Sequence, residues 1–476
     1  MTQRLLAELA AIVGPAAVLT DPEQTQAFYN DWRGVFRGNA MAVVRPQSTQ
    51  EVARVVALAH ATRTAIVPQG GNTGLAAGAT PLGLDGAIVL SLSRMHRIES
   101  VDPIGNTLTA QAGCVLTDVQ AAANVANRLF PLSLGAEGSA QIGGLISTNA
   151  GGSGVLRYGT MRALVLGLEA VLPDGSIVDG LRALRKDNAG YDWKQLFIGA
   201  EGTLGIVTSA VLRLFPKPRF QTTALLGLSN PKDALRAFSQ LQELLGDTLV
   251  ACELFSDTTV TLRFAQQPSL TRPMPARPWY LLLEAAASLQ GTRDAFEAAL
   301  GTLIDADIAS DCVVAESQRQ SDELWEWRES IPETEKRAAR SAKHDVSVPI
   351  VDVPRFIEEA ILAVETAHPG TRVLAFGHVG DGNVHFNVLL PGEDAVRSDA
   401  VNATVHAIVT AYRGSITAEH GIGRYRRDEL PTQRSPQEMT LMRAVKHAID
   451  PLGIMNPGSV LTMPPDVGSA SEYSPV

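Results

Sequence analysis

The chain has 476 residues, of which 45% are hydrophobic and 19% are charged, and its formal net charge is −10. This length predicts two or three domains, because single hydrophobic cores stop growing well below it. The acidic balance excludes a nucleic-acid partner, which needs a concentrated basic surface, and no apolar run reaches the roughly 18 residues of a membrane helix. The three widely spaced cysteines exclude a disulfide scaffold and a cysteine-ligated iron–sulfur cluster within the chain.

The first part of the chain, residues 1–218, alternates β-branched runs with glycine-rich turns and amphipathic helices. Residues 1–38 are expected to be helical, and the apolar spacing over 1–14 favours a packed amphipathic helix over a secretory signal. We predict a strand at 41–44, a helix at 51–64, and strands at 65–68, 163–172 and 205–215. Pro216 and Pro218 then end this first domain.

The second part, residues 219–428, changes to strands separated by long helices. Strands are predicted at 222–228, 280–284 and 372–376, and helices at 231–245 and 353–367. This pattern indicates an α+β domain on the substrate side. Residues 429–462 form a C-terminal segment, helical over 429–451 with an Asn-Pro-Gly turn at 456–458, and residues 463–476 are predicted to be a disordered tail.

Glycine-rich stretches gather in the first domain, at 68–75 (PQGGNTGL), 135–154 (GAEGSAQIGGLISTNAGGSG), 186–191 (KDNAGY) and 198–207 (IGAEGTLGIV). The first has neither the Walker A ending nor the Rossmann spacing, and alone it fits a tight turn as well as a pyrophosphate cradle. Several such stretches together indicate that backbone N–H groups line a long ligand such as a dinucleotide.

These stretches resemble the FAD-binding domain of the vanillyl-alcohol oxidase superfamily, also called PCMH-type. The residues of these motifs are most similar to those of the D-2-hydroxyglutarate and D-lactate dehydrogenase branch. The resemblance runs along nearly the whole chain. It implies an α+β protein with a two-part PCMH-type FAD-binding domain (1–218), a substrate or cap domain with a mainly antiparallel sheet (219–428), and a C-terminal segment (429–462) that returns to the flavin.

The resemblance implies FAD, with its pyrophosphate over 68–75, its isoalloxazine near 143–153 and its adenosine side near 201–207. The quoted loops contain no histidine, so we expect non-covalent FAD. The cofactor-binding residues expected from it are Pro68, Gly70, Gly71, Asn72, Thr73, Gly74, Leu75, Gly138, Ser139, Gly143, Gly144, Asn149, Gly151, Gly152, Ser153, Glu201, Gly205, Ile206, Val207 and Asn456.

The segment 376–387 (FGHVGDGNVHFN) predicts a β-hairpin, with Asp-Gly at 381–382 as a two-residue turn. That turn pairs His378 directly with His385, with Cβ atoms about 5 Å apart. Facing imidazoles can hold one metal ion, and Asn387 lies on the same face. The segment TAEHGIG at 417–423 offers Glu419 as a third ligand and leaves coordination positions open. The alternative is that the histidines only pack across the strands.

The matching family positions imply that His378, His385 and Glu419 bind a divalent metal, zinc or alternatively manganese, and that His420 is the catalytic base. They also place Arg328 and Lys343 in the substrate pocket with Asn387, whereas residue type alone favours solvated surface charges for both cations. Pro332 stands where D-2-hydroxyglutarate dehydrogenases tend to have a small hydroxyl residue, which weakens the case for a five-carbon diacid.

The expected function is therefore an FAD- and metal-dependent dehydrogenase that oxidises a D-2-hydroxy acid, D-2-hydroxyglutarate or D-malate, to the 2-oxo acid with hydride transfer to flavin N5. A D-lactate or glycolate dehydrogenase, a non-catalytic flavin electron-transfer subunit and a non-redox flavin lyase or synthase are the alternatives. The acceptor stays open between oxygen, an electron-transfer flavoprotein and a quinone, as does a homodimer. The cytoplasm is the expected location, peripheral to a membrane if the acceptor lies there.

Overall fold

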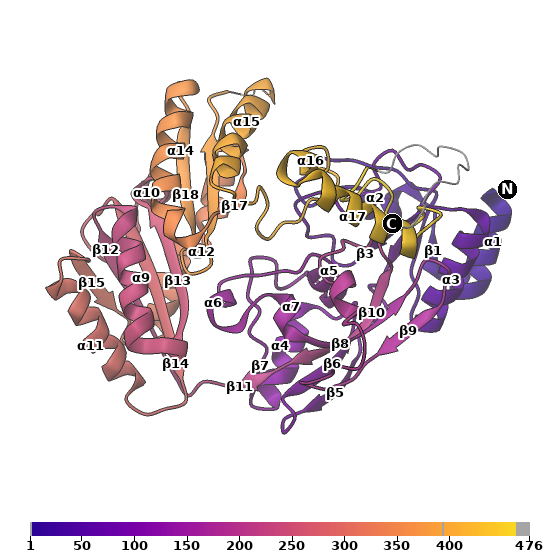
Figure 1. Cartoon of the computed structure of the whole chain (residues 1–476), viewed down its shortest axis with the longest axis horizontal. Helices are drawn as coiled ribbons and strands as arrows, with labels where there is room; N and C mark the ends of the chain where they lie inside the picture. Colours follow the sequence, from indigo (N-terminus) through magenta and orange to yellow (C-terminus); the bar gives the residue numbers. More distant parts are fainter. Residues whose placement is uncertain (1, 393–394, 463–476) are drawn as a thin grey trace.

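A computed structural model describes residues 2–392 and 395–462, and Figure 1 shows them as two lobes. The N-terminal lobe runs to about residue 216 and has one large hydrophobic core. The cap, from about residue 220 to 416, has its own cores. The yellow helices α16 and α17 lie back over the N-terminal lobe. The α+β architecture predicted from the sequence is confirmed.

The N-terminal lobe begins with a small mixed sheet. Its strand order is β1 (Val18–Leu19), β2 (Ala42–Val44), β4 (Ile88–Ser91) and β3 (Ile66–Gln69), and β2 and β3 run parallel to β4. The same part of the chain contains three helices, α1 (Thr2–Val13), α2 (Pro22–Tyr29) and α3 (Thr49–Thr62). The expected helical stretch 1–38 is wrong, because Gly14 at φ 87° and the following Pro15 end α1, and a 3₁₀ turn and β1 follow.

The second sheet of this lobe is antiparallel, in the order β5 (Ile98–Asp102), β6 (Thr107–Gln111), β10 (Ile206–Arg213), β8 (Val165–Val171) and β9 (Ile177–Gly180). The strand predicted at 163–172 begins two residues late, after helix α7 (Met161–Leu164). The strand predicted at 205–215 divides into β10 and β11 (Phe215–Pro216), and β11 pairs with β7 (Arg128–Leu129). Short helices connect these strands: α4 (Leu116–Val125), α5 (Ile142–Ser147), α6 (Val155–Tyr158) and α8 (Lys194–Phe197).

The cap contains an eight-stranded sheet whose pairings are all antiparallel, as predicted. Its order is β15 (Asp311–Val314), β12 (Phe220–Leu228), β14 (Trp279–Ala287), β13 (Leu249–Ser256), β18 (Arg372–His378), β19 (Asn383–Leu389) and β16 (Ser341–Ala342), with β17 (Asp345–Ser347) also on β19. The helices predicted at 231–245 and 353–367 are confirmed as α9 (Pro231–Leu245) and α14 (Val353–Ala367).

Helices cover both faces of the cap sheet. Alternate strand residues belong to different cores, so that Leu254 and Ala375 pack on one face and Phe255 and Phe376 on the other. The first face carries α9, α11 (Thr292–Asp305), α14 and α15 (Ala395–Ala411). The second face carries α10 (Asp257–Gln266), α12 (Gln318–Glu329) and α13 (Ile331–Ala338).

The predicted hairpin between β18 and β19 exists, but its predicted register is wrong. Phe376, not His378, pairs with His385, and the connection spans residues 379–382. The reason lies in neighbouring strands: the Val379 N–H donates to Cys252 and the Gly382 carbonyl accepts from Val348. Those backbone groups are therefore not available for pairing across the hairpin. A slip of two residues keeps every side chain on its face.

The C-terminal segment returns to the N-terminal lobe as expected. It contains α16 (Leu430–Gln433) and α17 (Pro436–Ile449), so the helix predicted over 429–451 is interrupted where Ser435 caps α17 and Pro436 begins it. Met455 then forms a bridge to Ile66 of β3. The predicted disordered tail lies outside the described residues. Among the residues that are described, no helix has the length and apolarity to cross a membrane.

Candidate active site

A cluster of histidines and carboxylates lies on the cap sheet at the side of α12. His378 ends β18, His385 is in β19 and Asp345 begins β17, while Glu419 and His420 come from the loop that follows α15. Two overlapping triads have ligand atoms within 4.8 Å of one another: His378, His385 and Glu419, and Asp345, His385 and His420. The slipped hairpin register does not separate the two histidines of β18 and β19, whose ring centroids are 5.7 Å apart.

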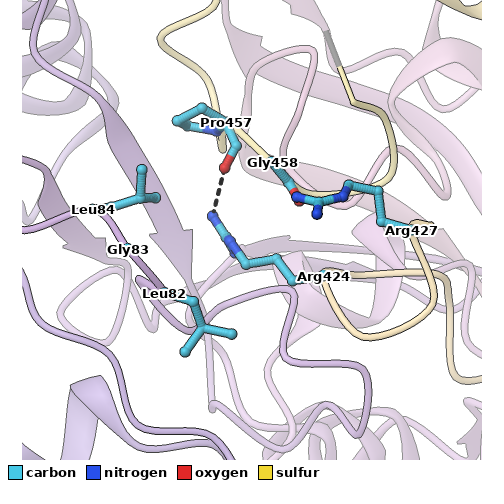
Figure 2. A pocket seen from close by; sticks show the side chains of 7 residues that line it. All are labelled: Leu82, Gly83, Leu84, Arg424, Arg427, Pro457 and Gly458. Atoms are coloured by element: carbon cyan, nitrogen blue, oxygen red, sulfur yellow. Dashed lines mark hydrogen bonds between the residues drawn. The ribbon is translucent and has the colours of Figure 1, made fainter.

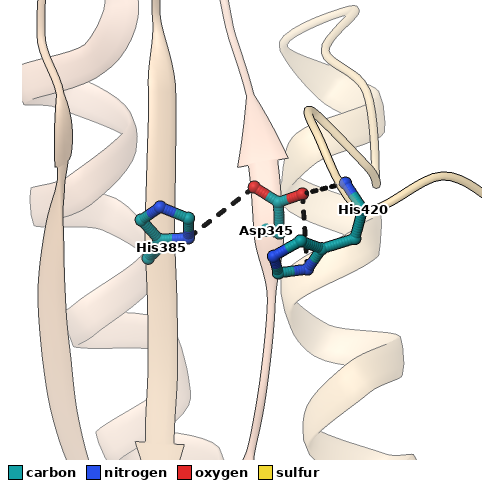
Figure 3. Close-up of side chains that lie close together, drawn as sticks. All are labelled: Asp345, His385 and His420. Carbon is teal, nitrogen blue, oxygen red and sulfur yellow. Dashed lines mark hydrogen bonds and ion pairs between the residues drawn. The ribbon is translucent and has the colours of Figure 1, made fainter. Parts of the chain in front are cut away.

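Asp345 is the buried centre of this cluster (Figure 3). Its Oδ2 accepts the backbone N–H groups of Glu419 (2.8 Å) and His420 (2.9 Å) and lies 3.5 Å from His420 Nδ1. Its Oδ1 accepts Asn383 Nδ2 at 2.7 Å and lies 3.7 Å from His385 Nδ1. Burial raises the pKa of Asp345, but His420 and His385 outweigh burial, and its pKa is lowered. Asp345 therefore orients two imidazoles and the loop between them.

Glu419 differs from Asp345 because its carboxylate accepts no hydrogen bond from any residue that the structure describes. Its nearest ionic neighbour there is His378 Nε2, at 4.0 Å from Oε1. Burial raises the pKa of Glu419 to about 7. A carboxylate that accepts no hydrogen bond in the described part of the chain, beside two imidazoles that each face another carboxylate through Nδ1, is a donor set that suits a divalent cation. The oxygens of Asp345 are already occupied, so Glu419 is the better third ligand.

The N-terminal lobe supplies a glycine cradle. A Cβ on Gly71 would lie 1.9 Å from the Ser139 carbonyl oxygen, so the loop 68–75 touches the loop 135–145 along its backbone. Gly74 and Gly144 have no neighbour within 4 Å of a Cβ position. The buried Oε1 of Gln141 has no hydrogen-bond partner within residues 2–392 and 395–462. Open glycines around an unsatisfied buried polar atom are what an extended ligand needs.

The two lobes meet at the triad of His378, His385 and Glu419. A Cβ on Gly151 would lie 2.7 Å from Glu419 Oε1, so the glycine loop 147–154 of the N-terminal lobe lies against the carboxylate of the cap loop. The Glu201 carboxylate accepts the backbone N–H groups of Ile422 and Gly423, each at 2.8 Å. The loop 417–423 is therefore held from both lobes.

The comparisons with known proteins agree with these two parts. Residues 217–460 match the family "FAD linked oxidases, C-terminal domain", and residues 40–180 match the family "FAD binding domain". The mitochondrial D-2-hydroxyglutarate dehydrogenase of Bos taurus is 37% identical over 457 residues, which cover 95% of this chain and 83% of that protein.

The chain belongs to the FAD-linked oxidase family.

Other relatives carry related names. The D-2-hydroxyglutarate dehydrogenase of Stutzerimonas stutzeri strain A1501 is 38% identical, over 96% of this chain and 98% of that protein. A putative mitochondrial D-lactate dehydrogenase of Schizosaccharomyces pombe is 37% identical, over 92% and 85%. A solved p-cresol methylhydroxylase has a TM-score of 0.77 at 16% identity, with 96% of both chains covered, which shows the fold alone. This FAD-linked oxidase is an FAD-dependent oxidoreductase, as its sequence predicted.

Several of the predicted FAD-binding residues of this FAD-linked oxidase have side chains that are buried or hydrogen-bonded within the protein. Ile206 and Val207 are buried in β10, and Asn72 donates its side-chain amide to the carbonyls of Ala27 and Asn30. Asn456 donates to the carbonyls of Gly78 and Glu201. The residues present fit FAD as a ligand of glycine-rich backbone, and the individual contacts stay predictions.

The predicted substrate-binding cations of the family are engaged within the protein. Arg328 Nε donates to Glu253 Oε2 at 2.8 Å, and Lys343 Nζ lies 3.1 Å from Glu335 Oε2. Asn387 also donates to Glu335 Oε2, at 2.8 Å. The family resemblance places Arg328 and Lys343 in the substrate pocket but does not indicate the carboxylates that accompany them, Glu253 and Glu335.

A small cavity lies beside His420, between the lobes. Its walls include Lys343, Asp345 and Thr417 of the cap side and Leu75 of the first glycine loop. Three cationic residues line it, Arg33, Lys343 and Arg426. Arg33 has no acidic partner among the described residues, and the sequence analysis did not single it out.

Another cavity lies where the C-terminal segment crosses residues 82–84 (Figure 2). Its two guanidinium groups already bind protein acceptors: Arg424 donates to the Gly78 and Pro457 carbonyls, and Arg427 donates to Asp428 and to the Gly458 carbonyl. None of the predicted site residues is among those that line this cavity.

Sequence signals for the missed carboxylates exist only in part. Glu253 is the one charged residue of β13, whose eight residues are all buried, and a lone acid in an apolar strand is worth noting. Asp345 lies two residues after Lys343, and Lys343 was the only residue of that segment for which we predicted a role. Glu335 lies in a charge-rich helix where its burial is not apparent from the sequence.

Proposed function

We propose that this FAD-linked oxidase oxidises a D-2-hydroxy acid to the corresponding 2-oxo acid, with a divalent metal ion bound by His378, His385 and Glu419. Zinc is the expected metal and manganese the alternative. The observation that carries the proposal is the triad of ligand atoms within 4.8 Å whose carboxylate lies against Gly151 of the flavin lobe. A hydride acceptor and a Lewis acid then meet at one place.

In this proposal the cofactors and the residues of the chain have separate roles in the reaction. When bound, FAD supplies the hydride acceptor and the metal ion polarises the substrate hydroxyl. His420 takes the hydroxyl proton at Nε2, because Nδ1 faces Asp345 Oδ2 at 3.5 Å. A positioned base of this kind contributes about 10²–10⁴-fold. Asp345 holds the imidazole and the backbone of residues 419 and 420, which keeps the base in place.

D-2-Hydroxyglutarate is the substrate that we favour, because relatives similar over nearly the whole chain carry that name. Arg33 in the wall of the cavity, which has no acidic partner among the described residues, supports a second carboxylate on the substrate. D-Lactate is the second candidate. Its support is that Arg328 and Lys343 already have carboxylate partners and that a similar relative is named a putative D-lactate dehydrogenase.

A substrate panel with an artificial dye acceptor tests the reaction. We expect turnover of D-2-hydroxyglutarate and D-malate, slower turnover of D-lactate and none of the L-enantiomers. Arg33→Gln and Arg328→Ala, each against wild type, tell which cation meets the distal carboxylate, since loss of that contact raises KM for the diacids more than for D-lactate. A wild-type preference for D-lactate would move the assignment to the second candidate.

Metal content and flavin content test the two cofactors separately. His378→Ala and Glu419→Ala should remove the metal and most activity while the FAD absorbance stays, because the two groups bind different lobes. His368→Ala is the matched control, since in the described part of the chain the His368 side chain bonds to Thr404 and is not part of the cluster. Acid should release free FAD from the protein. Fully active wild-type protein without metal would contradict the metal site.

The remaining expectations concern partners. An electron-transfer flavoprotein or a quinone is the proposed acceptor, and a dimer of identical chains and a cytoplasmic location stay predictions. Comparison of reduction rates with each acceptor, and the mass of the native protein in solution, check the first two.

A further inference from the structure

Glu253 is a buried carboxylate that touches two predicted site residues at once. It lies in the middle of β13, where it is 1% exposed and is the direct cross-strand neighbour of His378 in β18. Its Oε1 forms a short hydrogen bond with His378 Nδ1. Its Oε2 accepts Arg328 Nε at 2.8 Å, and the Arg328 guanidinium lies 4.7 Å from the Phe376 ring centroid.

This contact determines which nitrogen of His378 faces the metal-type cluster. A carboxylate that accepts from Nδ1 holds the proton there and leaves Nε2 as the lone-pair donor. His378 Nε2 is the atom that points at Glu419, 4.0 Å from Oε1. Arg328 supplies the second charge partner that a carboxylate so deeply buried requires.

We propose that Glu253 is a positioning residue, which fixes His378 in its metal-binding tautomer and anchors Arg328 of α12 beside the same site. The inference rests on the proposed metal site and adds to it a link between metal affinity and the cap helix that carries Arg328. Glu253 contacts neither metal nor substrate in this role and acts through its two neighbours.

Glu284 allows the positioning role to be separated from a purely structural one. It lies on the adjacent strand β14, is also buried, and accepts Trp325 Nε1 of the same helix α12 at 2.9 Å. Both carboxylates therefore attach α12 to the same face of the sheet. In the described part of the chain, only Glu253 also bonds to a histidine of the triad.

The experiment compares Glu253→Gln and Glu284→Gln in the full-length flavoprotein, after removal of metal with a chelator. Zn²⁺ affinity is measured by competition, and the visible spectrum of bound Co²⁺ reports the ligand geometry. We expect Glu253→Gln to bind Zn²⁺ about 10- to 100-fold more weakly than wild type and to change the Co²⁺ spectrum. Glu284→Gln should match wild type in both measurements.

Each outcome has a distinct meaning. Equal affinities and identical Co²⁺ spectra for wild type and Glu253→Gln would overturn the positioning role while leaving the metal site in place. Wild type without Zn²⁺ affinity would overturn the proposed metal site itself. If Glu253→Gln does not fold, Glu253→Asp replaces it, because it keeps the charge beside Arg328 but draws the oxygen back from His378, and the same loss of affinity is expected.

Discussion

Asp345 shows how much one residue can organise. Its two oxygens accept three hydrogen bonds, two from the backbone of the loop at 419–420 and one from Asn383. It also faces the imidazoles of His385 and His420. A buried carboxylate with this many donors is stabilised in its charged form. His385 and His420, the proposed metal ligand and the proposed base, therefore both face Asp345.

Asp345→Asn should lower kcat by about 10- to 100-fold, the usual effect of removing a group that orients an active-site imidazole. The amide cannot accept both backbone N–H groups and also face two imidazoles, so His420 loses its orientation. Steady-state kinetics and metal analysis measure the effect. Asp233→Asn is the control, because Asp233 is equally buried but belongs to the N-terminal cap of α9. An unchanged kcat in Asp345→Asn would contradict the role of Asp345.

At the scale of elements, the flavin cradle depends on two glycine loops that touch. Gly71 approaches the Ser139 carbonyl more closely than any side chain allows, since a Cβ would lie only 1.9 Å from that oxygen. The loop after β3 and the loop before α5 therefore lie against each other along their backbones. The side-chain amide of Asn72, in the first of these loops, donates to the Ala27 and Asn30 carbonyls.

Gly71→Ala should weaken FAD binding by about 5- to 150-fold, which corresponds to a strain of roughly 1–3 kcal/mol from overpacking at the contact of the two loops. Flavin fluorescence titration of the deflavinated protein gives the Kd. Gly86→Ala is the control, because a Cβ at Gly86 has no neighbour within 4 Å. Equal FAD affinity in both variants would show that the loops are free to separate.

At the scale of the whole molecule, the loop 417–423 of the cap is in contact with the N-terminal lobe. Glu201 of the N-terminal lobe accepts the N–H groups of residues 422 and 423, and Asn456 of the C-terminal segment donates to the Glu201 carbonyl. Burial raises the pKa of Glu201 to about 7. The loop that carries Glu419 and the proposed base His420 is therefore held by the N-terminal lobe.

Glu201→Ala should lower the free energy of unfolding by about 1–3 kcal/mol, because two backbone N–H groups lose their acceptor. Hydrogen exchange should increase over residues 417–424, and activity should fall with the loss of order there. Thermal unfolding and exchange mass spectrometry measure both effects. Glu243→Ala, at an exposed position of α9, should change neither. Unaltered exchange in Glu201→Ala would show that the cap alone orders the loop.

The sequence by itself determined the features that depend on local pattern. Apolar periodicity located α9 and α14 to the residue, and the glycine stretches located the flavin lobe. His378 and His385 were placed on one face although their register was wrong by two residues, because strand side chains alternate with a period of two. The order of the motifs along the chain was enough to indicate the family.

Only the tertiary structure determined which carboxylates contact those residues. Glu253 meets His378 because β13 is the neighbour of β18 in the sheet, 125 residues away in sequence. Arg328 and Lys343, which the family resemblance places in the substrate pocket, each lie beside a carboxylate, Glu253 and Glu335. Strand order and the docking of α12 and α13 fix these pairs. Buried charges require partners, but periodicity along the chain carries no information on which strand supplies them.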